Sequence, residues 1–148
     1  MTTAHSNAGG EAQIRALIDK QIAAVRAKDV SGLLASYAPD VVVFDLVNPL
    51  QYRGSDALRK RAAEWLSSFE GPVGYEARDV RIVASDDLAY CHSLNRVTGT
   101  TTQGKKIDMS WRATLCCRKI DGRWMVTHGH SSVPFDMESG KASLDLRP

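Results

Sequence analysis

The sequence predicts an α+β fold in which a curved antiparallel sheet is covered on one face by three N-terminal helices. In the first half of the chain, apolar residues recur mainly at helical spacing, with one apolar strand among them. In the second half, the apolar residues alternate with period two over four long segments. Helices followed by a run of strands indicate α+β, and a bent sheet closed by helices forms a cone with a lined cavity.

Helical periodicity in the first half predicts three helices. The first is expected over residues 10–28, where Gln21 interrupts an otherwise apolar stripe. A second, short helix follows and is expected to end at Pro39. The third is expected to begin with Ser55 as its N-cap, to bury a stripe that includes Trp65 and to end at Gly71-Pro72.

Five strands are expected. An early apolar run predicts a strand over residues 41–47, which Asn48-Pro49 ends. Asp121-Gly122 between two apolar runs indicates a hairpin. The four late strands are expected over residues 73–84, 89–101, 106–120 and 124–133.

A chain of 148 residues is expected to form one domain. Residues 1–10 are interpreted as a flexible lead-in and residues 11–135 as the domain. Residues 136–148 are polar and lack clear periodicity, so we expect a loosely packed tail.

Composition argues against several partners. A net charge of +2 is too small to indicate nucleic acid, and the Arg59–Arg61 triplet is interpreted as a solvated helix face. No run approaches the ~20 apolar residues of a membrane span, and the N-terminus does not resemble a secretory signal. Three cysteines without zinc spacing are expected to be reduced thiols in the cytoplasm. With no glycine-rich phosphate loop, we expect neither a cofactor nor a metal.

Asp45 is the first candidate for chemistry, because it lies in an apolar strand. An ionised carboxylate in such surroundings costs free energy unless it is paired or lines a cavity. It is either a general base in an apolar pocket or a structural group bonded to backbone N–H groups or to an arginine such as Arg112.

Two histidines in the last strand are the next candidates. Alternation places His128 and His130 on the same face as Trp124 and Val126, unless Gly129 marks a bulge that changes the phase. They are candidates for acid and base, for anion binding or for part of a metal site. The alternative is that they form hydrogen bonds across the sheet or at a dimer interface.

Four further residues are candidates for substrate binding. Gln21 offers an amide donor, and Trp65 lies on the buried stripe of its helix. Arg112 would clamp a substrate carboxylate or pair with Asp45, unless it is a surface arginine. Cys116 is either a reactive thiol or an inert buried one.

Three blocks resemble a known family. They are the segment from Asp29 to Asp45, the helix start Gly54-Ser55-Asp56-Ala57-Leu58, and the ending DGRWMVTHGHSSVP. Over residues 11–135 the chain resembles the nuclear transport factor 2-like superfamily, and within it the SnoaL-like and ketosteroid isomerase-like proteins. The resemblance implies a cystatin-like roll with Asp45 at the position of the general base. Gln21 takes the place of one oxyanion donor, and Cys116 lies near the place of the other.

These observations together predict a small-molecule pocket protein. The first hypothesis is a cofactor-free isomerase, cyclase or dehydratase that acts on an apolar carbonyl compound, with Asp45 as base and His128 or His130 assisting. The second is a non-catalytic ligand-binding or assembly module. In the late strands, apolar residues occur at both odd and even positions and therefore on both faces of the sheet. The helices cover one face, so we also expect a homodimer that covers the other.

Overall fold

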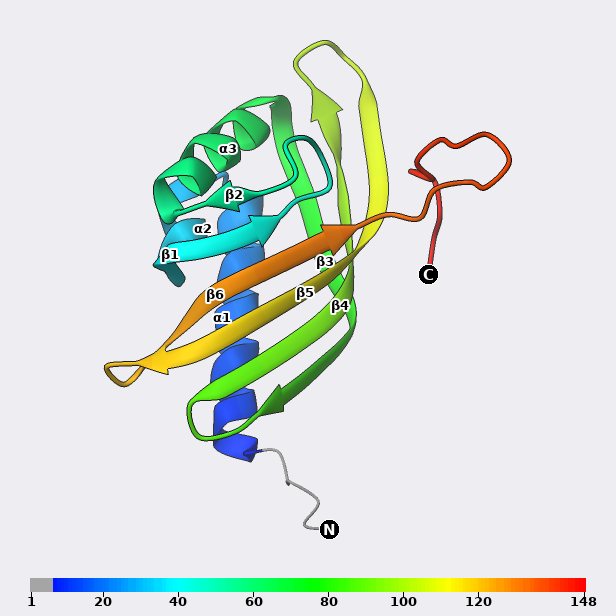
Figure 1. Ribbon diagram of the computed structural model, residues 1–148. Helices are drawn as coiled ribbons and strands as arrows, with labels where there is room; N and C mark the ends of the chain where they lie inside the picture. The colour runs from blue at the N-terminus through cyan, green and yellow to red at the C-terminus, as the bar shows by residue number, and fades with distance from the viewer. Residues whose placement is uncertain (1–6) are drawn as a thin grey trace.

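The computed structural model describes residues 7–148, which form helices on one side of a curved six-stranded sheet (Figure 1). The helices are α1 (Ala8–Arg26), α2 (Val30–Leu34) and α3 (Ser55–Ser67). The strands are β1 (Tyr37–Phe44), β2 (Tyr52–Arg53), β3 (Phe69–Ala84), β4 (Leu88–Thr101), β5 (Lys106–Ile120) and β6 (Arg123–Ser132). The α+β class and the curved sheet predicted from the sequence are confirmed.

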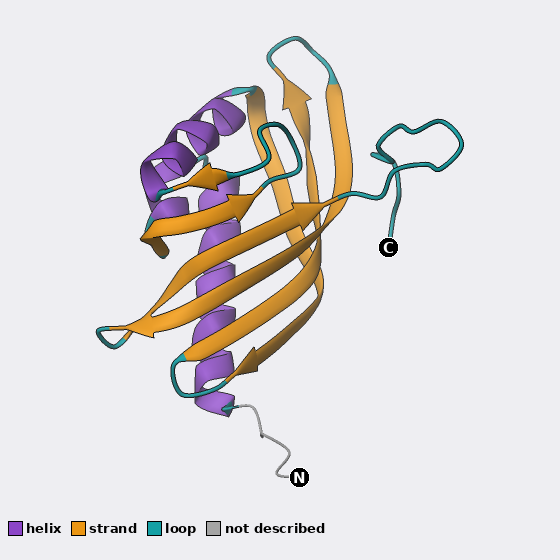
Figure 2. Cartoon of the chain, viewed as in Figure 1, coloured by secondary structure: helices purple, strands orange, loops and turns teal. Residues whose placement is uncertain are grey.

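The sheet has the strand order β2-β1-β6-β5-β4-β3. β1 lies parallel to β6, and all other neighbours are antiparallel. The strands bend around the long helix α1, so the sheet has a concave face toward the helices and a convex face away from them (Figure 2). The expectation of three N-terminal helices is only loosely matched, because α3 follows two strands and α2 has 5 residues.

β1 begins earlier than the sequence predicts. It runs from Tyr37 to Phe44 and therefore contains Pro39, which was expected to end a helix. The pairing of β1 with β6 shifts register between Tyr37 and Val42, and β2 pairs only at Val42 and Val43. Proline is tolerated where a strand is irregular or at an edge, because no ladder bond needs its N–H. Asp45 consequently lies just after the strand rather than inside it.

Strand β3 also contains a proline. Gly71 and Pro72 were expected to separate α3 from the sheet, but β3 already begins at Phe69. β3 is an edge strand, and its pairing with β4 shifts register between Glu70 and Gly74. The irregular edge accommodates Pro72 for the same reason as in β1.

Helix α3 is preceded by Gly54, not by the expected N-cap Ser55, which is its first residue. Gly54 has a φ of 87°, a conformation that only glycine adopts without strain. Its N–H donates to the carbonyl of Val41 at 2.7 Å, which fixes the start of α3 against β1.

The core lies between the helices and the concave face. One cluster joins α1 to the strands and includes Ile14, Val41 and Val126, all fully buried. The other joins α3 to β4 and β5 and includes Leu66 and Trp111. Residues of both clusters line a cavity, which is described below.

The ends of the chain differ from one another. The expected lead-in lies outside the described residues as far as position 6, and α1 begins at Ala8. After β6 the chain folds back, with a bridge between Phe135 and Ala142. Arg147 bonds the carbonyl oxygen of Asp108 at 3.0 Å and its carboxylate at 3.4 Å. Among residues 7–148, no helix is both long and apolar enough to cross a membrane.

Candidate functional site

A cavity of about 640 Å³ lies between the helices and the concave face of the sheet. This volume is in the range of small-molecule sites. Its wall is mainly apolar, and side chains from all three helices and from the strands β1, β3, β4, β5 and β6 contribute to it. Five aromatic residues line it: Tyr37, Trp65, Phe69, Tyr75 and Trp111.

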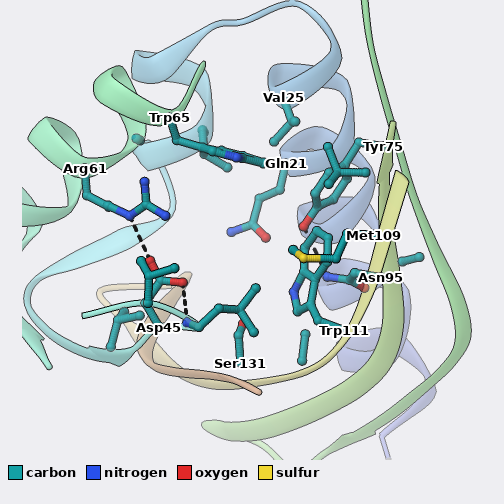
Figure 3. Close-up of a pocket in the computed structure, with 18 of the residues that line it drawn as sticks. Gln21, Val25, Asp45, Arg61, Trp65, Tyr75, Asn95, Met109, Trp111 and Ser131 are labelled. Atoms are coloured by element: carbon teal, nitrogen blue, oxygen red, sulfur yellow. Dashed lines mark hydrogen bonds and ion pairs between the residues drawn. The ribbon is translucent and has the colours of Figure 1, made fainter. Parts of the chain in front are cut away.

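An ion pair stands on one wall of the cavity (Figure 3). The Nε of Arg61 donates to Oδ2 of Asp45 at 3.0 Å, and the N–H of Leu46 donates to Oδ1 at 2.6 Å. The two charged side chains are 24% and 22% exposed, so each is mostly covered but still reaches the cavity. Each carboxylate oxygen keeps a lone pair that these bonds do not use.

Local structure explains why these two residues meet. Asp45 is the first residue after β1, and Arg61 lies one helical turn before Trp65 on the inner side of α3. The interpretation of the basic triplet as fully solvated is wrong at Arg61: Arg59 and Lys60 are exposed, whereas Arg61 is half-buried. The partner of Asp45 is therefore Arg61.

A chain of three hydrogen-bonding side chains lies on the opposite wall. The hydroxyl of Ser93 donates to Oδ1 of Asn95 at 2.7 Å, and Nδ2 of Asn95 donates to the hydroxyl oxygen of Tyr75 at 3.1 Å. Ser93 and Asn95 share the concave face of β4, and Tyr75 comes from β3. Because Tyr75 accepts a bond, its own proton remains available to a ligand, and such a chain is cooperative.

A second phenol, Tyr37, lines the same cavity. Among residues 7–148, its hydroxyl has no hydrogen-bond partner in the protein. Burial, and secondarily the neighbouring Tyr75, raises its pKa above the ordinary value. Burial likewise raises the pKa of Tyr75 to about 12, with Asn95 opposing the shift and Asp45 adding to it. Both phenols are therefore protonated donors at neutral pH.

Three residues proposed from the sequence meet in this cavity: Asp45, Gln21 and Trp65. Gln21 comes from α1 and lies between the ion pair and the tyrosine in the view of Figure 3. Its Nε2 is 3.5 Å from the hydroxyl of Ser36, so its amide oxygen is available to a ligand.

Neither of the two histidines lines the cavity. The register of β5 with β6 shifts so that Cys116 pairs with His128 and Cys117 with Val126, which leaves Thr127 as an extra residue. This bulge reverses the alternation: Val126 faces the core, and then Ser131 lines the cavity. The histidines were expected to share a face with Val126. Because of the bulge at Thr127 they lie on the convex face instead, so that expectation is wrong.

On the convex face, the histidines contact β1. Nδ1 of His128 donates to the carbonyl of Val42 at 2.7 Å. Its ring and that of His130 pack edge-on against Phe44, with ring centroids 4.8 Å and 5.4 Å apart. These contacts match the second interpretation made for the histidines, hydrogen bonding across the sheet.

Two proposed substrate-binding residues also lie on the convex face. Arg112 and Cys116 alternate with Ala113 and Leu115, which line the cavity. The Nε of Arg112 donates to the hydroxyl of Ser132 at 3.1 Å. Arg112 and Cys116 were expected to contact a ligand in the cavity. Their position on the strand points them to the other face, so that expectation is wrong.

No metal centre is assembled in the part of the chain that the structure describes. Within residues 7–148, no three His, Cys, Asp or Glu side chains are gathered closely enough to hold an ion. The free thiols of Cys91 and Cys117 are buried.

A curved sheet backed by helices around an apolar cavity defines the class of fold to which this chain belongs. The chain belongs to the SnoaL-like domain family, whose model matches residues 14–136. No curated protein matches the chain in sequence.

Solved structures agree with this assignment. An NTF2-like protein of unknown function from Pseudomonas putida KT2440 is 36% identical, with 97% of this chain and 100% of that chain covered and a TM-score of 0.88. A ketosteroid isomerase-like protein from Erwinia carotovora atroseptica shares the fold at 22% identity, with 85% and 97% covered and a TM-score of 0.72.

Proposed function

We propose that the protein is an enzyme that moves a proton within an apolar carbonyl compound, as an isomerase or dehydratase does. One observation carries the proposal: an apolar cavity holds a carboxylate on one wall and neutral phenol donors on another. Removing a proton next to a carbonyl requires a placed base and a donor to the oxygen that becomes negative.

Each polar group has a role in this scheme. The carbonyl oxygen of the substrate accepts hydrogen bonds from Tyr75 and Tyr37. Asp45 takes the proton from the adjacent carbon, and the electron pair moves onto the carbonyl oxygen to form an enolate. In a substrate with a β,γ-double bond the enolate is conjugated, and Asp45 returns the proton to the γ-carbon, which shifts the C=C bond. In a substrate with a β-hydroxyl the enolate collapses to a C=C bond, the C–O bond breaks, and the hydroxyl takes the proton from Asp45 and leaves as water.

The ion pair supports this scheme electrostatically. When Asp45 accepts the proton it becomes neutral, and the positive charge of Arg61 is no longer matched by its neighbour. That charge then offsets part of the negative charge that the substrate gains. Stabilisation that appears only as the charge develops lowers the barrier rather than the energy of the bound substrate.

A non-catalytic ligand-binding module is the competing function. The bonds of Asp45 to Arg61 and Leu46 favour it, because they satisfy the carboxylate without a substrate. The two functions differ in one observable, which is whether the cavity accelerates proton exchange on a bound ketone.

The test uses 2-tetralone, an apolar ketone, in deuterated buffer, with loss of its α-proton signals followed by NMR. We expect the wild-type protein to accelerate exchange and Asp45→Asn to lower that acceleration by about 10²–10⁴-fold, since the variant loses the base and keeps the volume. Asp40→Asn is the matched control, because Asp40 is exposed on β1. An undiminished rate in Asp45→Asn, or no acceleration by the wild type across apolar ketones, contradicts the enzyme.

We further propose that the protein is a homodimer formed through the convex face. Phe44, Leu88 and Tyr90 are 37%, 53% and 45% exposed and lie on that face. A second copy would cover them by two-fold symmetry. Light scattering should give a dimer at micromolar concentration and a monomer for Phe44→Glu. A monomeric wild type contradicts this proposal.

A further inference from the structure

We propose that the ligand of this cavity carries a carboxylate, which Arg61 binds. The inference rests on the proposed function only in taking the same cavity as the ligand site. It narrows the substrate class to apolar oxo acids, in which a ring or chain separates the carbonyl from one acidic group.

The hydrogen-bonding capacity of Arg61 is the first argument. A guanidinium has five N–H donors, and only the Nε–H of Arg61 is used, by Asp45. Among residues 7–148, neither of its terminal nitrogens has a protein partner, although the side chain is only 24% exposed. In Figure 3, one nitrogen of Arg61 is joined to Asp45 by a dashed line, and no line reaches the other two. The terminal nitrogens remain accessible, so an acceptor inside the cavity can reach them.

The shape and charge of the group favour a carboxylate. Two terminal N–H groups of an arginine form a planar fork that matches the two oxygens of a carboxylate. Of the residues between positions 7 and 148 that line the cavity, Arg61 is the only cationic one. A single guanidinium suits a singly charged group, whereas a di- or triphosphate would be left with several unmatched charges.

The neighbours of Arg61 define the rest of the ligand. Trp65, one turn further along α3, lines the cavity with Arg61 and offers an apolar surface for a ring next to the acid. Tyr75 and Asn95 are on the far side of the cavity in Figure 3, with Gln21 between. A ligand that spans the cavity therefore places its carboxylate at Arg61 and its carbonyl at Tyr75.

Asp45 makes the inference testable in a second way. Without a ligand, the ion pair of Arg61 and Asp45 carries no net charge. A bound carboxylate therefore adds a negative charge beside Asp45. Replacing Asp45 by asparagine removes the repulsion and keeps an acceptor for Nε. Binding of an acid should therefore become tighter in Asp45→Asn, in the same variant in which turnover is lost.

The experiment compares 2-naphthoate with its neutral isostere 2-naphthamide by calorimetric titration. We expect the wild type to bind naphthoate at least about tenfold more tightly, in line with a charge-assisted hydrogen bond. Arg61→Met should abolish this preference, and Arg61→Lys should keep only part of it. Arg59→Met is the matched control, because it removes the same charge from an exposed position on α3.

The outcomes separate this inference from the proposed function. Equal binding of acid and amide, a preference that persists in Arg61→Met, or no binding of naphthoate at millimolar concentration overturns it. If Arg61→Met does not fold, Arg61→Lys and Asp45→Asn give the same decision. An acid preference without proton exchange on any ketone leaves the inference standing and contradicts the enzyme. Proton exchange that depends on Asp45, without a preference for the acid, supports the enzyme and overturns the inference of a carboxylate ligand.

Discussion

The concave and convex faces of the sheet are formed by the same strands, but they place their polar groups in different surroundings. On the concave face, Tyr75 and Asn95 are aligned in a hydrogen-bonded chain beside an apolar cavity. On the convex face, His128 and His130 lie against Phe44 at the surface. The difference shows that placement, rather than intrinsic reactivity, decides which side chains are available for chemistry on a ligand.

The largest expected effect is on catalysis. Tyr75→Phe should lower the exchange rate of 2-tetralone by about 10²–10³-fold, which is typical of losing one oxyanion donor. His130→Gln, on the convex face, should leave the rate within about twofold. The same NMR assay measures both. A large loss in His130→Gln, or none in Tyr75→Phe, would break the distinction between the faces.

Adjacent cysteines provide a second comparison. Burial raises the pKa of Cys117 to about 12 and that of Cys91 to about 11, so few thiolates form at pH 8. We expect both to react with iodoacetamide at least about 100-fold more slowly than Cys116, which is half-buried on the convex face. Their rates should rise with pH, because each folded-state pKa lies above its ordinary value.

This labelling is best done on Phe44→Glu, because a dimer would cover Cys116. Mass spectrometry of the digested protein assigns each rate to its cysteine. Cys116→Ser should remove the fast reaction. Fast labelling of Cys117 would mean that the concave face opens far more readily than its packing indicates.

Adjacent valines in β1 give the smallest expected effect. Val41 is fully buried on the concave side, whereas Val42 is half-buried on the convex side. Val41→Ala should lower the free energy of unfolding by about 2–3 kcal/mol, through lost burial and the cavity left behind. Val42→Ala should cost less than about 1 kcal/mol. Urea unfolding in the Phe44→Glu background measures both, and equal losses would contradict the assignment of the faces.

The sequence predicts which helices and strands form better than it predicts where each one begins and ends. Alternation in the late strands and helical spacing around Gln21 indicate the elements correctly, because each element buries one face. Pro39 and Pro72 were interpreted as breaks because proline lacks the N–H that a strand ladder needs. Both are tolerated where the pairing shifts register, and such shifts depend on partner strands distant in sequence.

The site is only partly predictable for a related reason. Asp45, Gln21 and Trp65 are recognisable as polar or aromatic residues on apolar segments, and all three line the cavity. Tyr37 and Tyr75 are ordinary strand residues in the sequence, and nothing local indicates which parity is concave. Arg61 belongs to a basic triplet that is typical of an exposed helix face. Its partner Asp45 lies sixteen positions earlier, after a strand, so the local sequence does not indicate the pairing.

The bulge at Thr127 has a consequence for how such proteins diverge. If Thr127 instead joined a regular ladder with β5, every residue of β6 after it would move by one position and turn to the other face. His128 and His130 would then face the cavity, and Ser131 would face outward. A change in how β6 pairs with β5 would thus exchange a hydroxyl wall for an imidazole wall, without substituting any residue that touches the ligand.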